Sequence, residues 1–354
     1  ASDVYKRQAY DRLIAEYRTS PFVARALLRQ GLVFYNANQN EEALAKFRQV
    51  VADHPRSQEA RQAVATAKLI YVDMGRVAEY ASWVKGIDFV EVTDAELDNA
   101  TFESAEKQRI EGKTEAAIRG YVNYLKDFPQ GLHTLQVNFN LAQLYYAQEN
   151  WEAALPNYRY AADAGANQYS EQALTRTCEL LLKTGQKNEA IPYLLRLENS
   201  AQIGQNQTFA QSNLMKLYYE QGAYDKTLDY ADKVLAAGDL DNRIRSDAKI
   251  MIARSAIKTN NETLAETAYR EVLPIATGAL AAEALYYDAY FREKAGDYEE
   301  SNTSVQKLAK SYSAYKEWGG RGLIIMARNY YALEDAYQAT YILESITVNF
   351  KEFP

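Results

Sequence analysis

The sequence repeats itself with a period of about 37 residues. Each copy has one reference position, called the anchor, which is a small residue in most copies. In most copies a bulky residue follows the anchor four places later, as with Ala43 and Phe47 or Ala154 and Tyr158. The nine anchors are positions 43, 80, 117, 154, 190, 227, 265, 301 and 339, so their successive differences are 37, 37, 37, 36, 37, 38, 36 and 38. Such regular spacing indicates one structural unit used many times, because self-similarity at this period is typical of stacked arrays.

A second landmark lies twelve residues before each anchor and is mostly small. Its members are Gly31, Lys68, Ala105, Ala142, Cys178, Met215, Ala253, Ala289 and Ala327. Gly or Asn stands between the two landmarks in many copies, and these residues allow a helix to end in the left-handed conformation. Each unit is therefore predicted to be a helix, a short turn and a second helix. A small residue lets two helices approach closely, and a bulky residue opposite it fills the remaining space.

The period divides the chain into nine predicted units after a partial first one. A capping box of Thr93 and Glu96 opens one first helix, and second helices are predicted to end near Pro55 and Pro129 because proline lacks an N–H. Residues 86–92 are expected to form a short extended piece between two units. The predicted boundaries are 1–20 for the partial unit, then 21–57, 58–93, 94–131, 132–167, 168–203, 204–241, 242–278, 279–314 and 315–354.

Composition excludes several classes of function. The net charge is −7 and no long basic run occurs, which argues against nucleic-acid binding. No stretch of 18 apolar residues occurs, so no transmembrane segment is predicted. One cysteine rules out an internal disulfide framework or a cysteine-based zinc site.

No catalytic residue, metal site or cofactor is predicted. Cys178 stands at the small position of its helix and is interpreted as a packed apolar group. The run from Gly319 to Gly322 lacks the Lys-Ser/Thr pair of a phosphate-binding loop. The sequence therefore predicts a non-catalytic protein.

The residues of the best copy resemble the tetratricopeptide repeat. Leu141-Ala142, Tyr145, Asn150-Trp151, Ala154 and Tyr158 form that copy, and the likeness extends over nearly the whole chain. The resemblance implies an all-α fold, a right-handed α-solenoid of about nine helix-turn-helix units. The period departs from the family's usual value of about 34 residues, and the closing proline is often missing.

The segments Pro55-Arg56-Ser57 and Pro129-Gln130-Gly131 make the chain resemble large bacterial envelope-associated members of this family. That resemblance implies a periplasmic or outer-membrane-associated location.

In the family, first helices line a concave groove that binds a protein or peptide segment. The resemblance therefore implies that the side chains beside the buried bulky residue, and three residues earlier, face a partner. Tyr and Arg commonly anchor protein interfaces, and in the Tyr-Tyr pairs one ring is expected in the core and the other on display. The predicted groove residues are Tyr35, Arg109, Tyr146, Lys216, Tyr219, Arg254, Tyr290, Arg328 and Tyr331.

Two other functions stay open at this stage. One is a glycan-binding outer-membrane lipoprotein on the same frame, which would need exposed Trp on long loops; the chain has Trp83, Trp151 and Trp318. The other is a structural spacer or oligomerisation segment.

Both ends of the chain look cut. Residues 1–8 are interpreted as a scar, and residues 9–18 as the second helix of a unit that lacks its first. At the other end Tyr341, Ile342, Ile346 and Phe350 share a face with nothing after it to cover them. The chain is therefore expected to be a fragment of a longer array that could self-associate through uncapped ends.

Overall fold

The computed structural model describes residues 2–238 and 240–350, and its regular structure there is helical throughout. This result confirms the predicted all-α fold. The chain divides into two compact units, residues 1–177 and residues 178–354. The boundary falls within α10 (Ser170–Lys183). The predictions for residue 1 and residues 351–354 lie outside the described part.

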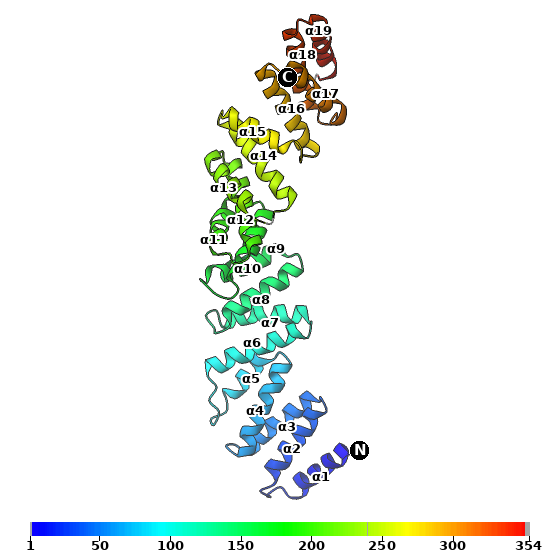
Figure 1. Ribbon diagram of the computed structural model, residues 1–354. Helices are drawn as coiled ribbons and strands as arrows, with labels where there is room; N and C mark the ends of the chain where they lie inside the picture. Colours follow the sequence, from blue (N-terminus) through cyan, green and yellow to red (C-terminus); the bar gives the residue numbers. More distant parts are fainter. Residues whose placement is uncertain (1, 239, 351–354) are drawn as a thin grey trace. The chain divides into compact units, whose positions relative to one another are not determined.

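The N-terminal unit is a stack of consecutive antiparallel helices (Figure 1). Its first helices, in the sense of the repeat, are α2, α4, α6 and α8, and its second helices are α3, α5, α7 and α9. The bounds are α1 (Ser2–Glu16), α2 (Val23–Asn36), α3 (Asn40–Asp53), α4 (Gln58–Asp73), α5 (Val77–Val84), α6 (Asp94–Ile110), α7 (Thr114–Asp127), α8 (Thr134–Ala147) and α9 (Trp151–Asp163).

The C-terminal unit has the same organisation. Its first helices are α12, α14, α16 and α18, and each packs against the second helix that follows it. The bounds are α11 (Lys187–Ser200), α12 (Gly204–Glu220), α13 (Tyr224–Ala236), α14 (Asn242–Lys258), α15 (Glu262–Val272), α16 (Gly278–Ala295), α17 (Tyr298–Ser311), α18 (Lys316–Ala332) and α19 (Ala336–Asn349).

The nine anchor positions of the repeat are all buried. At the twelve-residue landmark, eight of the nine residues are buried; the exception is Lys68, whose neighbour Ala67 is buried in its place. The bulky residues four places after the anchors are also buried in most copies, and Phe47, Tyr121 and Leu194 have no exposed surface. Leu343 departs from the pattern because half of its surface is exposed.

The contact between Gly31 and Phe47 shows why the landmark is small. A Cβ built on Gly31 of α2 would lie 2.5 Å from Cε1 of Phe47 on α3, well inside contact distance. The same holds in α6 and α7, where a Cβ on Gly120 would lie 2.8 Å from Cβ of Ala105. The helix pairs therefore cross closely at positions where only a small side chain fits.

The turns between first and second helices use the predicted left-handed conformation. Asn38 has a φ of 57°, and glycines 75, 112, 185, 222 and 296 also have positive φ. Glu149 and Glu334 take up the same conformation without being glycine, with φ of 57° and 63°. A side chain with a Cβ is strained there.

We expect the substitution Glu149→Gly to stabilise the N-terminal unit by about 0.5–1 kcal/mol, because glycine relieves the strain at positive φ. The Glu149 side chain is exposed, so little contact is lost. The matched change is Gly222→Ala in the turn after α12, where φ is 73° and the space is open; it should destabilise by a similar amount. Urea denaturation measures both, and a shift of both variants in the same direction would contradict the strain argument.

The helix ends follow the predicted signals. Thr93 and Glu96 form the capping box at the start of α6, and α3 and α7 end two residues before Pro55 and Pro129. Residues 86–92, however, do not form a strand; they are turn and irregular backbone. The apolar side chains there, including Ile87 and Phe89, pack on the core of the N-terminal unit, which leaves α5 only eight residues long.

The expected uncovered face of α19 is also different in the structure. Ile342 and Ile346 pack into a core cluster with residues of α16–α18, and Phe350 lies against Gly320 of α18. Tyr341 is exposed as expected, together with Tyr337 and Val348. The prediction is therefore wrong for Ile342, Ile346 and Phe350, which pack against earlier helices.

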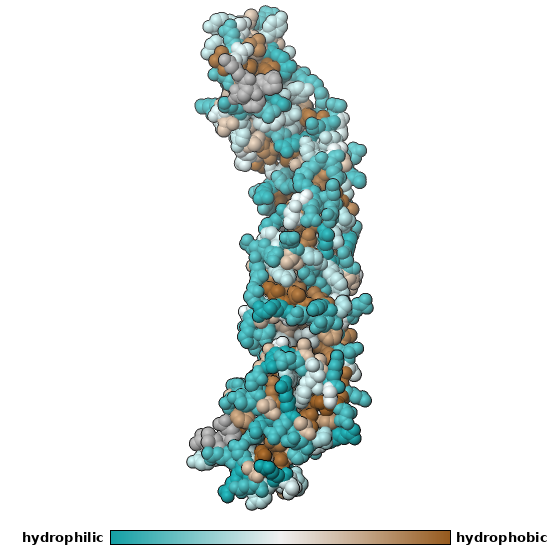
Figure 2. Space-filling view, turned by 180° about the vertical axis from the view of Figure 1, so that it is seen from behind, coloured by the Kyte–Doolittle hydropathy of each residue, from teal (hydrophilic) through white to brown (hydrophobic). Residues whose placement is uncertain are grey.

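The surface mixes polar and apolar side chains. On the face shown in Figure 2, hydrophobic residues form separate patches among hydrophilic ones. Within residues 2–238 and 240–350, none of the helices combines the length and apolarity that crossing a membrane requires.

Candidate functional site

The nine predicted groove residues all lie on first helices, in the second half of each. Tyr35 is on α2, Arg109 on α6 and Tyr146 on α8; in the C-terminal unit Lys216 and Tyr219 are on α12, Arg254 on α14, Tyr290 on α16, and Arg328 and Tyr331 on α18. We use the name first-helix face for this set within each unit. Their exposure differs greatly, and all four charged members form ion pairs within the protein.

In the N-terminal unit the first-helix face is joined by polar contacts from one repeat to the next. Lys107 of α6 binds Asp73 of α4 at 2.5 Å. Asn140 of α8 donates to Glu106 of α6 at 3.1 Å, and Arg109 forms an ion pair with the same Glu106 on its own helix. Arg109 is therefore engaged within the protein.

Tyr146 takes part in a further contact between first helices. The guanidinium of Arg176, on α10, donates to the Tyr146 hydroxyl at 3.0 Å and lies 4.5 Å from the centre of its ring. The ring of Tyr146 also packs against Trp151 and Tyr158, at centroid distances of 4.9 Å and 6.2 Å. Tyr146 is thus half-buried rather than displayed.

The C-terminal unit repeats this arrangement with three ion pairs between successive first helices. Lys216 of α12 binds Asp247 of α14 at 2.6 Å. Arg254 of α14 holds both carboxylate oxygens of Glu283 of α16, at 2.8 Å and 2.5 Å. Arg328 of α18 binds Glu293 of α16 at 2.9 Å.

These pairs alter the acidity of their members. The hydrogen bonds that Arg254 donates to Glu283 raise the pKa of Arg254, and burial raises the pKa of Glu293 despite the opposing effect of the Arg328 charge. Lys216, Arg254 and Arg328 therefore link neighbouring repeats, whereas Arg109 is paired within its own helix.

Among the five tyrosines of the first-helix face, Tyr331 is exposed and the other four are half-buried. Tyr331 has 76 % of its surface exposed, while its neighbour Tyr330 packs on a core cluster, as the sequence predicted for that pair. Tyr218 is buried, and Tyr219 is half-buried with its ring 5.7 Å from that of Tyr224. The 145–146 pair departs from the prediction, because Tyr145 is only partly buried in the core.

Two other predicted aromatic residues are half-buried. Tyr35 packs against the core of the N-terminal unit. Tyr290 lies 5.2 Å from Phe291, centre to centre, and the ammonium of Lys294 stands 5.5 Å from its ring.

A feature that sequence reasoning missed is a set of carboxylates held by tyrosines from a second helix. Glu106 accepts from Tyr121, and Asp98 accepts from Tyr124 at 2.5 Å. Glu198 accepts from Tyr230, and Glu283 from Tyr269, each at 2.8 Å. For Glu198 a signal was available, because it lies eight residues after the anchor at position 190 and so on the same side of its helix.

The cluster at Glu198 predicts acid sensitivity. Burial opposes ionisation of Glu198, but hydrogen bonds from Lys233 and Tyr230 outweigh it and hold its pKa below the usual value. A carboxyl whose pKa is depressed by folding stabilises the protein above its unfolded-state pKa of about 4.3, and this contribution is lost as the pH falls through the folded value.

We therefore expect Glu198→Gln to flatten the fall of the unfolding free energy between about pH 6 and pH 3. Urea denaturation across this range measures it. Glu220→Gln, which removes a carboxylate from an exposed pair with Lys187, should keep the parent's pH dependence. A Glu198→Gln curve parallel to that of the parent would contradict the prediction.

The described residues show neither a metal-binding cluster nor an activated cysteine. In the described residues, no group of three His, Cys, Asp or Glu side chains could hold a metal ion. Cys178 is buried, and burial raises the pKa of its thiol to about 12, so the nucleophilic thiolate is disfavoured at neutral pH.

The three tryptophans do not form a sugar-stacking platform. Trp83 is packed with Tyr71 and Tyr80, at centroid distances of 6.3 Å and 6.4 Å. Trp151 packs on Tyr146, and Trp318 lies 5.3 Å from Tyr286. Each ring is partly buried within its own unit.

The family model of the tetratricopeptide repeat matches residues 25–57, a segment that contains most of α2, all of α3 and the contact of Gly31 with Phe47. No curated protein sequence resembles the chain closely enough to count as a relative.

Solved structures with a similar arrangement have low identity. YrrB, described as a TPR protein with an unusual peptide-binding site, is 16% identical, with 58% of this chain and 96% of that chain covered and a TM-score of 0.39. PilF of Pseudomonas aeruginosa is 14% identical, with coverages of 79% and 96% and a TM-score of 0.34. The C-terminal part of a TPR repeat-containing protein from Cytophaga hutchinsonii is 12% identical, with coverages of 73% and 99% and a TM-score of 0.39. Likeness at this level carries no argument about function.

Proposed function

We propose that this tetratricopeptide repeat protein is a non-catalytic scaffold that binds a protein or peptide segment on its first-helix face. The family match supplies the premise at residues 25–57, and the other helix pairs repeat the buried anchors of that segment. What the fold provides is a row of similar helix surfaces, which suits an elongated partner.

The exposed ring of Tyr331 is the observation that carries this proposal. It stands on α18 one turn from Arg328, whose charge is already matched by Glu293. A partner that covers Tyr331 gains a large amphipathic contact and meets no unmatched charge at this pair. Tyrosine is enriched among the residues that dominate binding energy at protein interfaces.

The paired charges also shape the choice of partner. Lys216, Arg254 and Arg328 are neutralised by carboxylates of neighbouring repeats, so the face does not attract a strongly acidic or strongly basic chain. Tyrosine rings and compensated pairs instead favour a segment of mixed polar and apolar side chains. The predicted partner is therefore a protein segment without a dominant charge.

The test compares three immobilised chains with extracts of the source organism: the parent, a Tyr219→Ala/Tyr331→Ala variant, and Tyr337→Ala. Tyr337 is as exposed as Tyr331 but lies on a second helix, α19, and is therefore the matched control. We expect a protein held by the parent and by the control to bind the double variant about thirtyfold more weakly, the ratio for a loss of about 2 kcal/mol.

Circular dichroism first establishes that the three chains are equally helical. Equal recovery of every bound protein by all three would rule out the first-helix face and favour a spacer role. Loss on the Tyr337→Ala chain alone would place binding on the second helices.

A further inference from the structure

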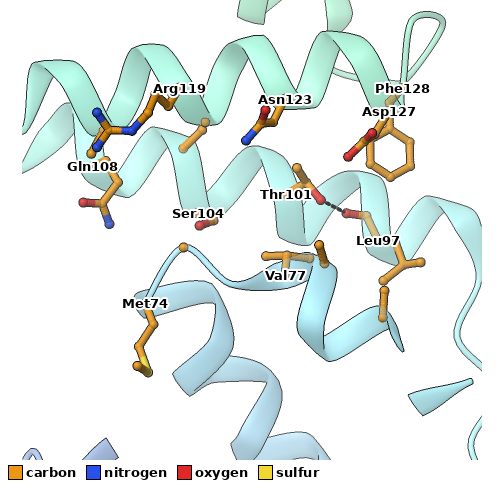
Figure 3. A pocket seen from close by; sticks show the side chains of 16 residues that line it. Met74, Val77, Leu97, Thr101, Ser104, Gln108, Arg119, Asn123, Asp127 and Phe128 are labelled. Atoms are coloured by element: carbon orange, nitrogen blue, oxygen red, sulfur yellow. Dashed lines mark hydrogen bonds between the residues drawn. The ribbon is translucent and has the colours of Figure 1, made fainter. Parts of the chain in front are cut away.

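The N-terminal unit contains a cavity of about 380 Å³ between α5 and the pair α6–α7 (Figure 3). Its origin is the shortness of α5 and the small side chains on both walls. Ala78 and Ala81 line it from α5, and Ser104, Ala105 and Gly120 line it from α6 and α7. Because small residues face small residues here, the helices leave a space between them.

The cavity has an apolar side and a polar side. Val77, Ala78 and Ala81 of α5 lie opposite a row of polar side chains on α7. In Figure 3 this row runs along the helix, with Arg119 near one end, Asn123 in the middle and Asp127 near the other end. A ligand that fits must therefore be amphipathic.

The side chains of this polar row have no polar partner within the part of the chain that the structure describes. Arg119, Asn123 and Asp127 are exposed, and their side chains form no hydrogen bond or ion pair with the described residues, unlike the matched charges of the first-helix face. Asp127 is also the last residue of α7, where the helix dipole favours a cation. Lys126 precedes it but does not line the cavity.

The distance between the charges of Arg119 and Asp127 determines how long a peptide must be to contact both. Arg119 and Asp127 are eight residues apart on one helix, a separation of about 12 Å at 1.5 Å per residue. An extended chain covers about 13 Å in four residues, at about 3.3 Å each. In such a chain, residues at positions 1, 3 and 5 point to the same side.

We propose that this cavity is a second peptide-binding site, separate from the first-helix face. It takes an extended segment with an acidic residue and a basic residue four positions apart and a bulky apolar residue midway. The acidic side chain pairs with Arg119, the basic one with Asp127, and the apolar one enters the cavity against Ala78 and Ala81. Asn123 is placed to bond the backbone between them.

The length of the charged row distinguishes an extended segment from a helix. One leucine or isoleucine side chain with its backbone fits. A helical partner would need its two charges eight residues apart, which makes the two cases distinguishable.

The experiment measures fluorescence anisotropy of labelled peptides on the full chain. The probe is Glu-Thr-Leu-Thr-Lys with flanking prolines that oppose helix formation; the comparison peptides have Lys at both charged positions, Glu at both, or Asp in place of Leu. We expect the parent to bind the probe at least tenfold more tightly than any of these.

Two exposed substitutions sharpen the test. Arg119→Glu should reverse the preference, so that the peptide with two lysines binds more tightly than the probe. Ala78→Leu should fill the cavity and weaken the probe at least tenfold. Tyr331→Ala should bind the probe as the parent does, which separates this site from the proposed first-helix face.

Several results would overturn the proposal. One is equal binding of all four peptides by the parent, and another is unchanged probe affinity in Ala78→Leu or an unchanged preference in Arg119→Glu. A helical peptide with its charges eight residues apart that binds more tightly than the probe would also do so. Thermal unfolding of the variants confirms that each is folded before binding is measured.

Discussion

Replacing Phe47 by alanine should lower the stability of the N-terminal unit by about 3–5 kcal/mol. Phe47 is fully buried, and its ring fills the space that Gly31 leaves where α2 crosses α3. Removing the ring gives up the transfer free energy and leaves a cavity at a close crossing that cannot collapse easily. Urea denaturation followed by circular dichroism measures the total loss.

Hydrogen exchange shows where that loss falls, because a repeat contacts mainly its neighbours. Protection should drop in α2, α3 and α4 and persist in the C-terminal unit. The matched control is Leu69→Ala on α4, where about half of the side chain is exposed and the loss should stay within about 0.5 kcal/mol. Similar effects of the two substitutions would contradict the assignment of Phe47 as the core residue of the repeat.

Replacing Glu283 by leucine should destabilise the C-terminal unit by about 2–4 kcal/mol. The carboxylate is buried and accepts hydrogen bonds from Arg254 and from the Tyr269 hydroxyl. Leucine keeps most of the volume but leaves a half-buried guanidinium and a buried hydroxyl without an acceptor. Because Arg254 is partly exposed, water compensates for some of the loss, which sets the range below that of a fully buried pair. Chemical denaturation measures the change.

Two variants bracket this result. Glu283→Gln retains an acceptor for Tyr269 and should cost less than Glu283→Leu. Glu262→Ala removes an exposed ion pair with Lys294 and should cost much less than Glu283→Leu, because solvent screens exposed pairs. If Glu283→Leu were no more harmful than Glu262→Ala, the contact between α14 and α16 would not be a structural link between repeats.

The sequence was enough to predict the fold because the repeat imposes the same packing many times. Small residues such as Gly31 and bulky ones such as Phe47 recur at fixed positions. The boundaries of a copy that lacks one of these residues could therefore be predicted from the spacing of the adjacent copies. The turns were predictable for a similar reason, since Gly75 and Gly222 stand where the backbone requires positive φ. The residue types that favour turns thus occur where the repeat period predicts turns.

Other features depend on the register of stacking, which the period does not determine. Arg254 and Glu283 are 29 residues apart, and nothing in either helix alone shows that they meet. The same is true of Lys216 and Asp247. The predicted groove residues lie on first helices, as the repeat pattern indicated, but the ion pairs that three of them form with adjacent repeats were not predicted.

The cavity beside α5 was missed for a different reason. Residues 86–92 looked extended because they are rich in β-branched and aromatic side chains, but these side chains pack back on the core and end the helix early. The face of α19 was misjudged because the sequence gives the spacing of apolar residues but not the angle at which α18 meets them. Both errors concern where a helix ends or how it is rotated.

The proposal that partners bind on the first helices is tested most directly by photo-crosslinking from two positions. A photoreactive phenylalanine analogue replaces Tyr331 on α18 in one chain and Tyr337 on α19 in another; the two side chains are 76 % and 79 % exposed. With the protein captured by the parent chain present, a crosslink from position 331 and none from position 337 is the predicted result. A crosslink from position 337 alone would show that partners bind on the second helices and would contradict the proposal.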